Sequence, residues 1–103
     1  MTLEEIKKTL ETTGMPVVYL EWPENQAPDL PYICYLESGS NNFAADGGVY
    51  LPIKQIRVEL YTKTKNQDAE DKVEKALSSF FWQKDSMYIK SEKCYLTTYE
   101  FEV

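Results

Sequence analysis

The segment QIRVELYTKTKNQDAEDKVEKAL, residues 55–77, constrains the fold most strongly, because the spacing of its apolar residues changes within it. In its first half Ile56, Val58 and Leu60 alternate with polar residues, which predicts a strand buried on one face. In its second half apolar residues recur at intervals of three and four, which predicts an amphipathic helix over residues 68–82. The chain therefore combines a sheet with a helix packed on it. The expected apolar stripe of this helix is Ala69, Val73, Ala76, Leu77, Phe80 and Phe81.

The remaining elements follow from local signals. Thr2 and Glu5 have the spacing of a capping box, which predicts a first helix that ends before Gly14. Pro52 indicates a bend or an edge position within the third of the predicted strands. The order α-β-β-β-α-β-β predicts one α+β domain over residues 1–103, with a mixed or mainly antiparallel sheet and two helices on one face. Strands are predicted over residues 17–22, 32–38, 49–62, 87–90 and 94–103, and loops over the proline-rich residues 23–31 and the Gly/Asn-rich residues 39–48.

Charge and composition narrow the classes of partner. Seventeen acidic and eleven basic residues give a formal net charge of −6, which argues against direct, sequence-specific binding of nucleic acid. The amphipathic N-terminus does not resemble a signal peptide, and the longest apolar runs fall short of the roughly 20 residues that span a bilayer. We therefore expect a soluble protein made in a cytoplasm, without a membrane partner. Cys34 and Cys94 are expected as buried thiols, although a disulfide between neighbouring strands stays open.

The sequence offers little for catalysis. It contains no histidine, which excludes a Ser-His-Asp or Cys-His arrangement, and two cysteines are too few for an ordinary structural zinc site. Phosphate-binding glycine motifs are missing as well. We predict a protein that is not an enzyme and that needs no cofactor or metal. A carboxylate-based hydrolase is the weaker alternative, since the acidic pairs are expected on solvent-facing helix surfaces. These pairs are Glu4/Glu5, Glu70/Asp71 and Asp68/Asp71.

Aromatic residues suggest contacts with other proteins. Eight tyrosines and two tryptophans exceed what one small core requires, and these side chains are enriched in interfaces. Some of them, such as Tyr61 and Tyr99, are expected on exposed sheet faces or at strand ends. The alternative is that these aromatic residues complete the small core and its rim. Phe43 is the one large apolar residue between Gly39 and Gly48. It is either a lone exposed aromatic or the centre of a docking loop, and the sequence leaves both open.

The order of these motifs resembles the small tail-terminator and head–tail joining proteins of long-tailed phages and their prophages. The shared features are a Pro-aromatic strand, an Asn/Asp/Gly-rich loop ending in D-x-x-x-Y, and a strand v-x-v-E-L-Y-T. A helix K-x-x-x-x-E-x-x-v-E-x-x-L and a tyrosine-rich last strand complete them. The resemblance spans nearly the whole chain, as a pattern of composition and order. The corresponding residues here are Pro31 and Tyr32, residues 46–50, residues 58–62, residues 65–77 and residues 95–103.

This resemblance implies a structural virion protein at the head-proximal end of a phage tail, assembled in the host cytoplasm. It would form a ring with copies of itself, six being expected, and would contact the tail-tube protein and the head connector or adaptor. An acidic lumen would let DNA slide through, and Glu59, Glu100 and Glu102 would be candidates for surface charge, with the residues that face the lumen left open. A small monomeric or dimeric adaptor from a prophage or other mobile element is the alternative. The expected interface residues are Asn41, Asn42, Phe43, Asp46, Tyr50, Tyr61 and Tyr99.

Overall fold

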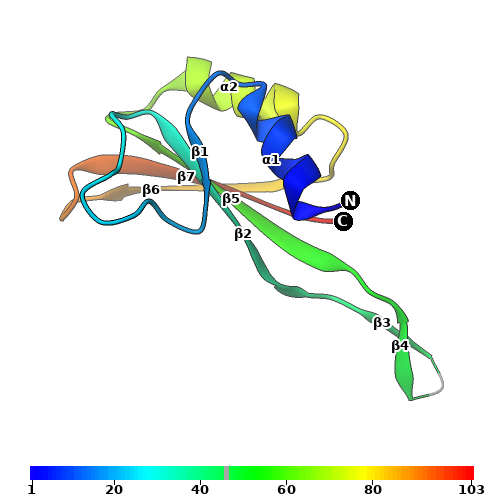
Figure 1. Cartoon of the computed structure of the whole chain (residues 1–103). Coiled ribbons are helices and arrows are strands. Elements are labelled where there is room, and N and C mark those ends of the chain that lie inside the picture. Colours follow the sequence, from blue (N-terminus) through cyan, green and yellow to red (C-terminus); the bar gives the residue numbers. More distant parts are fainter. Residues whose placement is uncertain (46) are drawn as a thin grey trace.

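The protein is a five-stranded sheet with two helices on one face and a thin two-stranded ribbon projecting from one end (Figure 1). The computed structural model describes residues 1–45 and 47–103, with the backbone alone described at Ala45 and Tyr50. The principal extents are 49 × 28 × 23 Å. The elements are α1 (Leu3–Glu11), β1 (Val17–Tyr19), β2 (Tyr32–Ser40), β3 (Phe43–Ala45), β4 (Gly48–Leu51), β5 (Lys54–Thr62), α2 (Gln67–Ala76), β6 (Gln83–Ile89) and β7 (Cys94–Glu102).

The main sheet has the strand order β1-β2-β5-β7-β6, and β3 pairs with β4 in a separate ribbon. β1 runs parallel to β2, whereas the other neighbouring strands of the main sheet are antiparallel. The sheet is therefore mixed, and the predicted α+β class is confirmed. The predicted order α-β-β-β-α-β-β describes the main sheet and its helices, to which the structure adds the ribbon.

The core lies between the helices and one face of the sheet. β5 places Ile56, Val58 and Leu60 on this face, and each of them is 0% exposed, as the alternation in the sequence predicts. β2 and β7 add further apolar side chains from either side of β5, and the two helices cover them. Burying aliphatic and aromatic side chains of this size contributes about 1.5–3 kcal/mol each. The core residues from the two helices and from the C-cap of α2 are Ile6, Leu10, Ala69, Val73 and Leu77.

The capping box predicted at the N-terminus is present. The Glu5 backbone N–H donates to Thr2 Oγ1, and the Thr2 backbone N–H donates to Glu5 Oε1, both at 3.1 Å. These hydrogen bonds lower the pKa of the Glu5 carboxyl below its ordinary value. After α1 the chain turns at Gly14, whose φ of +80° is the left-handed conformation that glycine adopts at little cost. Local chemistry therefore sets both ends of this helix.

Several predicted boundaries were wrong. β1 ends at Tyr19 instead of residue 22, and β6 begins at Gln83 instead of residue 87. α2 ends at Ala76, six residues before the predicted end. The helical spacing therefore no longer applies beyond Leu77. Phe80 stacks on Phe101 with ring centroids 4.5 Å apart, whereas Phe81, predicted to belong to the buried stripe, is 86% exposed.

The Gly/Asn-rich segment also differs from the prediction. Residues 39–48 were predicted as a loop and residues 49–62 as one strand. Instead β2 extends to Ser40, and β3 and β4 form the ribbon that projects beyond the sheet (Figure 1). Pro52 and Ile53 separate β4 from β5, so the chain is interrupted at the position where the proline predicted only a bend or an edge. Proline lacks the backbone N–H that a continuous ladder requires.

Glu70 is buried, although its helix position was predicted to face solvent. Its side chain is 3% exposed, and its Oε1 accepts hydrogen bonds from Lys65 Nζ at 2.8 Å and Lys84 Nζ at 2.7 Å. Lys84 also contacts Glu74 Oε2 at 2.7 Å. Burial alone would raise the pKa of Glu70, but the two lysines outweigh it and hold this pKa below the ordinary value. This cluster links α2 to the connection before it and to the edge strand β6.

Replacing Glu70 with glutamine should lower the free energy of unfolding by about 2 kcal/mol, because a neutral amide then replaces the buried carboxylate that pairs with the ammonium groups of Lys65 and Lys84. The pKa of Glu70 is lower in the folded than in the unfolded chain, so its stabilisation is full above about pH 4.5 and is lost as the pH falls through the folded value. Urea unfolding between pH 3 and pH 7 measures both effects. A Glu70→Gln variant whose stability falls as steeply with acid as that of the original chain would contradict this role.

Candidate protein–protein interface

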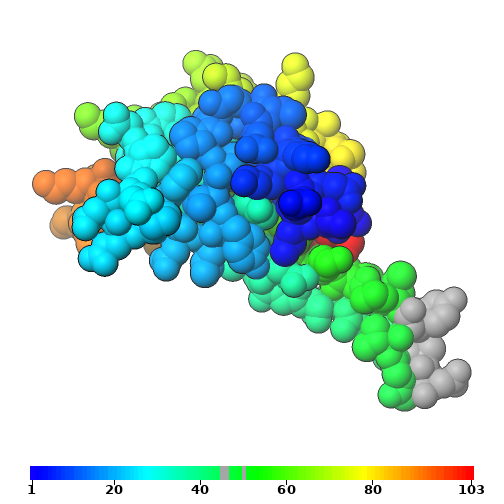
Figure 2. All heavy atoms as spheres, viewed as in Figure 1, coloured from blue at the N-terminus to red at the C-terminus, as the bar shows by residue number. Residues whose placement is uncertain are grey.

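The most prominent surface feature is the projecting ribbon with its connections, residues 41–53, which we call the arm. Figure 2 shows it leaving the body of the molecule as a narrow extension. Two hydrogen bonds close its base: the Asn41 backbone N–H donates to the Ile53 carbonyl at 2.9 Å, and the Ile53 N–H donates to Asn42 Oδ1 at 3.1 Å. Asn41 Nδ2 also donates to Glu102 Oε1 at 3.0 Å. Asn41 and Asn42, predicted as interface residues, thus hold the arm on the sheet.

The arm exposes apolar side chains that the chain itself leaves uncovered. Phe43, Val49 and Leu51 are 63%, 60% and 52% exposed. Phe43 lies opposite Leu51 in the ribbon, and Val49 shares the face of Leu51 because alternate residues of a strand point the same way. Phe43 is therefore exposed on the arm, outside the core. A contiguous exposed apolar face of this kind marks an interaction site more often than a scattered residue does.

The arm also differs from the rest of the chain in charge. Between residues 38 and 53 the sequence has a single charged residue, Asp46, although 27% of the whole chain is charged. Asp46, predicted as an interface residue, lies outside the described residues. Tyr50, also predicted, belongs to the backbone of β4, but its side chain is outside what is described. The arm can therefore approach an acidic protein surface with little like-charge repulsion.

The two remaining predicted interface residues have different environments. Tyr99 is 0% exposed and donates its hydroxyl to Glu74 Oε2 at 2.8 Å, so the prediction that it lies on an exposed face was wrong. The alternation along β7 places it on the helix-facing side. Tyr61 is half-buried on the opposite side of the sheet, where its hydroxyl donates to Glu59 Oε1 at 3.2 Å. Burial raises the pKa of both tyrosines above the ordinary value.

Tyr61 lines a groove of about 490 Å³ at the end of the sheet away from the arm. We call this the end groove. Its floor is the sheet face opposite the helices, where Tyr32 lies beside Tyr61. Its wall is the connection between β1 and β2, including Leu20, Trp22 and Leu30. The Trp22 ring meets the Tyr32 ring edge-on at 5.7 Å. The groove is not evident in the sequence, because its lining comes from segments far apart in the chain.

Two features of the end groove are not explained by the stability of the chain alone. Trp22 Nε1 is buried and, among the described residues, has no hydrogen-bond partner. Leu20 has a φ of +67°, a left-handed conformation that is unfavourable for leucine, and its side chain is 53% exposed. Each feature has an energetic cost in the folded chain. Such strain is concentrated at functional surfaces.

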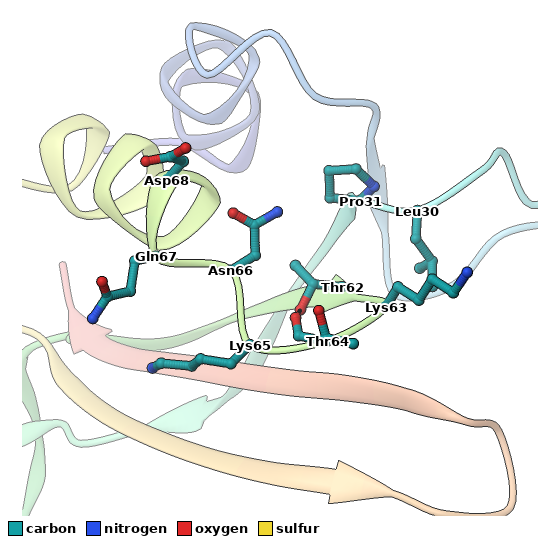
Figure 3. A pocket seen from close by; sticks show the side chains of 9 residues that line it. All are labelled: Leu30, Pro31, Thr62, Lys63, Thr64, Lys65, Asn66, Gln67 and Asp68. Carbon is teal, nitrogen blue, oxygen red and sulfur yellow. Dashed lines mark hydrogen bonds between the residues drawn. The ribbon is translucent and has the colours of Figure 1, made fainter.

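A second hollow, of about 540 Å³, lies where β5 passes into α2 (Figure 3). Asn66 Oδ1 accepts from the Ala69 backbone N–H at 3.0 Å and so caps α2, and Thr62 Oγ1 donates to the Thr64 carbonyl at 2.7 Å. Figure 3 shows the side chains of Lys63 and Lys65 pointing in opposite directions. These polar groups serve the connection itself and do not converge on a shared ligand position.

The acidic residues predicted as surface charge are already partly neutralised. Arg57 Nε lies 3.2 Å from Glu59 Oε2, and Arg57 Nη1 lies 3.8 Å from Glu100 Oε1. Glu102 receives the hydrogen bond from Asn41 at the base of the arm. The face of the sheet opposite the helices therefore contains interleaved charges, in contrast to the nearly neutral arm.

The cysteines and carboxylates whose side chains the structure describes do not form an arrangement suited to catalysis. Cys34 and Cys94 are buried free thiols, and burial, followed by the nearby Glu59, raises the pKa of Cys34 to about 12. A thiol with this pKa is protonated at neutral pH and is a poor nucleophile. Within residues 1–45 and 47–103, no three or more of the side chains that bind metals are grouped closely enough to hold an ion. In the same residues no helix combines the length and the apolar character needed to cross a membrane.

Replacing Leu20 with asparagine should raise the free energy of unfolding by about 1 kcal/mol, since asparagine tolerates the left-handed conformation and the leucine side chain is half exposed. The matched control is Leu51→Asn. Leu51 is equally exposed but is not among the residues with positive φ, so this change should bring no stabilisation. Chemical denaturation compares the two variants. Equal effects at both positions would show that Leu20 is not strained.

The fold of this chain is similar to that of a chain in a solved structure. No family model and no curated protein matches this sequence. Among solved structures, a chain in the virion of a native gene transfer agent particle superposes with a TM-score of 0.66 at 9% sequence identity. The match covers 90% of this chain and 81% of that chain. At this identity the likeness is one of fold, and the present chain has the same α+β architecture as that virion component.

Proposed function

We propose that this protein is a structural component of a phage-like virion that acts by assembly and catalyses no reaction. The observation that carries the proposal is the fold likeness, over most of both chains, to a chain of a gene transfer agent virion. The sequence motifs described above support the same class. The exposed apolar face of the arm, which the chain leaves uncovered, is what an assembly subunit needs and what a self-sufficient monomer does not.

In its specific form, the proposal is that the protein builds a ring at the head-proximal end of a tail. The ring ends growth of the tail tube, or joins the tail to the head, through contacts with the tail-tube protein and the head connector or adaptor. A closed ring requires two different surfaces on each subunit, because each copy contacts one neighbour with one surface and the next neighbour with the other. The arm and the end groove are two such surfaces.

Deleting the gene from the phage or prophage that carries it should yield headless tails of uncontrolled length, because nothing ends tube growth or joins the tail to the head. Electron microscopy of the particles measures tail length and the fraction of tails with heads. Complementation with the original gene should restore both. Particles of normal length with heads attached, in the absence of the gene, would contradict the proposal and favour the alternative of a small adaptor that binds one partner protein.

A further inference from the structure

We propose that the arm of one copy of this chain docks in the end groove of the next copy. This inference deepens the proposed function by naming the surfaces through which copies contact one another. It rests on three observations about the described residues, namely where the two surfaces lie, what each leaves unsatisfied, and how each is charged.

The two surfaces lie at opposite ends of the same strands. β5 begins next to the arm and reaches the groove at Tyr61, while β7 begins in the groove at Cys94 and ends at Glu102 beside the base of the arm. Figures 1 and 2 show the arm at one end of the molecule and the proline-rich segment at the other. An arm therefore cannot reach the groove of its own chain. A contact between them joins two copies head to tail, and repetition gives a ring or a filament.

The arm and the end groove are complementary in apolar side chains and in hydrogen-bonding groups. The arm offers the exposed side chains of Phe43 and Leu51, and the groove offers a wall and floor that contain Leu20, Tyr32 and Tyr61. The groove is large enough to take a buried aromatic side chain, which is the usual anchor of a protein interface. It also holds the unpartnered indole N–H of Trp22. A two-stranded ribbon has outward backbone carbonyls along its edges, and one of these can accept that hydrogen bond.

Charge identifies the arm as the segment of a second copy that can enter the groove. The chain has a formal net charge of −6, so two copies repel one another over most of their surfaces. Glu21 and Glu92 line the groove, and a negatively charged segment would be repelled there. The arm, with its single charged residue between residues 38 and 53, is the segment that can approach without this cost. In this contact, the left-handed conformation of Leu20 directs its side chain toward the incoming arm.

The test uses two variants that each remove one of the two surfaces. Phe43→Asp places a charge on the arm and leaves the groove intact, whereas Leu20→Asp places a charge in the groove and leaves the arm intact. Both side chains are more than half exposed, and aspartate tolerates the backbone conformation at position 20, so both variants should fold. Phe81→Asp is the matched control, since Phe81 is 86% exposed and lies outside the proposed contact.

Sedimentation velocity over a range of concentrations measures association. The original chain and Phe81→Asp should form reversible oligomers larger than dimers, and each surface variant alone should associate at least tenfold more weakly. An equimolar mixture of Phe43→Asp and Leu20→Asp should form dimers and nothing larger, because the mixture contains one intact arm and one intact groove for each pair. A symmetric arm-to-arm or groove-to-groove contact could not produce this result.

Three results would overturn the proposal. They are an original chain that stays monomeric at the highest soluble concentration, a Phe43→Asp variant that assembles like the original, and a mixture no more associated than its components. The gene-deletion experiment does not depend on any of these results. Failure of the contact is therefore distinguishable from failure of the proposed function. Conversely, arm-to-groove oligomers from a gene whose deletion leaves normal particles would retain the contact and remove the virion role.

Discussion

The pairing of β5 along both of its edges is the constraint on which the rest of the molecule depends. β2 and β7 flank it over nearly its whole length, and its inward side chains form the centre of the core. Because the helix-facing residues of β5 are fully buried, a shift of one residue in register would turn them to the opposite face. The same register places the arm at one end of the sheet and the end groove at the other. The positions of both surfaces therefore follow from the pairing of one strand.

Much of this architecture could be predicted from the sequence, because the responsible interactions are local. The capping box joins Thr2 to Glu5 within a single turn, and the alternation along β5 is a property of consecutive residues. Helix ends are harder to predict, since the apolar spacing of α2 continues in the sequence beyond the point where the helix stops. Phe80 and Phe81 illustrate the difficulty: both fit the helical stripe, yet one stacks on Phe101 and the other faces solvent.

The candidate interface was only partly predictable, for a physical reason. Phe43 could be named as a candidate interface residue because a single large apolar residue stands out in a polar segment. The end groove could not, because Leu20, Tyr61 and Cys94 meet only after the strands have paired. Tyr99 misled the prediction because tyrosine is common both in interfaces and in cores where its hydroxyl finds a partner, and Glu74 supplies that partner here. Glu70 was wrongly predicted to face solvent, because the sequence does not show that Lys65 and Lys84 will pair with its buried carboxylate.

The left-handed backbone at Leu20 has a consequence for the evolution of this gene. For an isolated chain, asparagine or glycine at that position would relieve the strain, so selection for stability alone would favour these residues. A leucine at position 20 is expected to persist only where its side chain brings a benefit outside the folding of a single copy. The residue at position 20 in a natural variant therefore indicates whether that variant still uses the groove for binding. A variant that no longer uses it is expected to replace the leucine early.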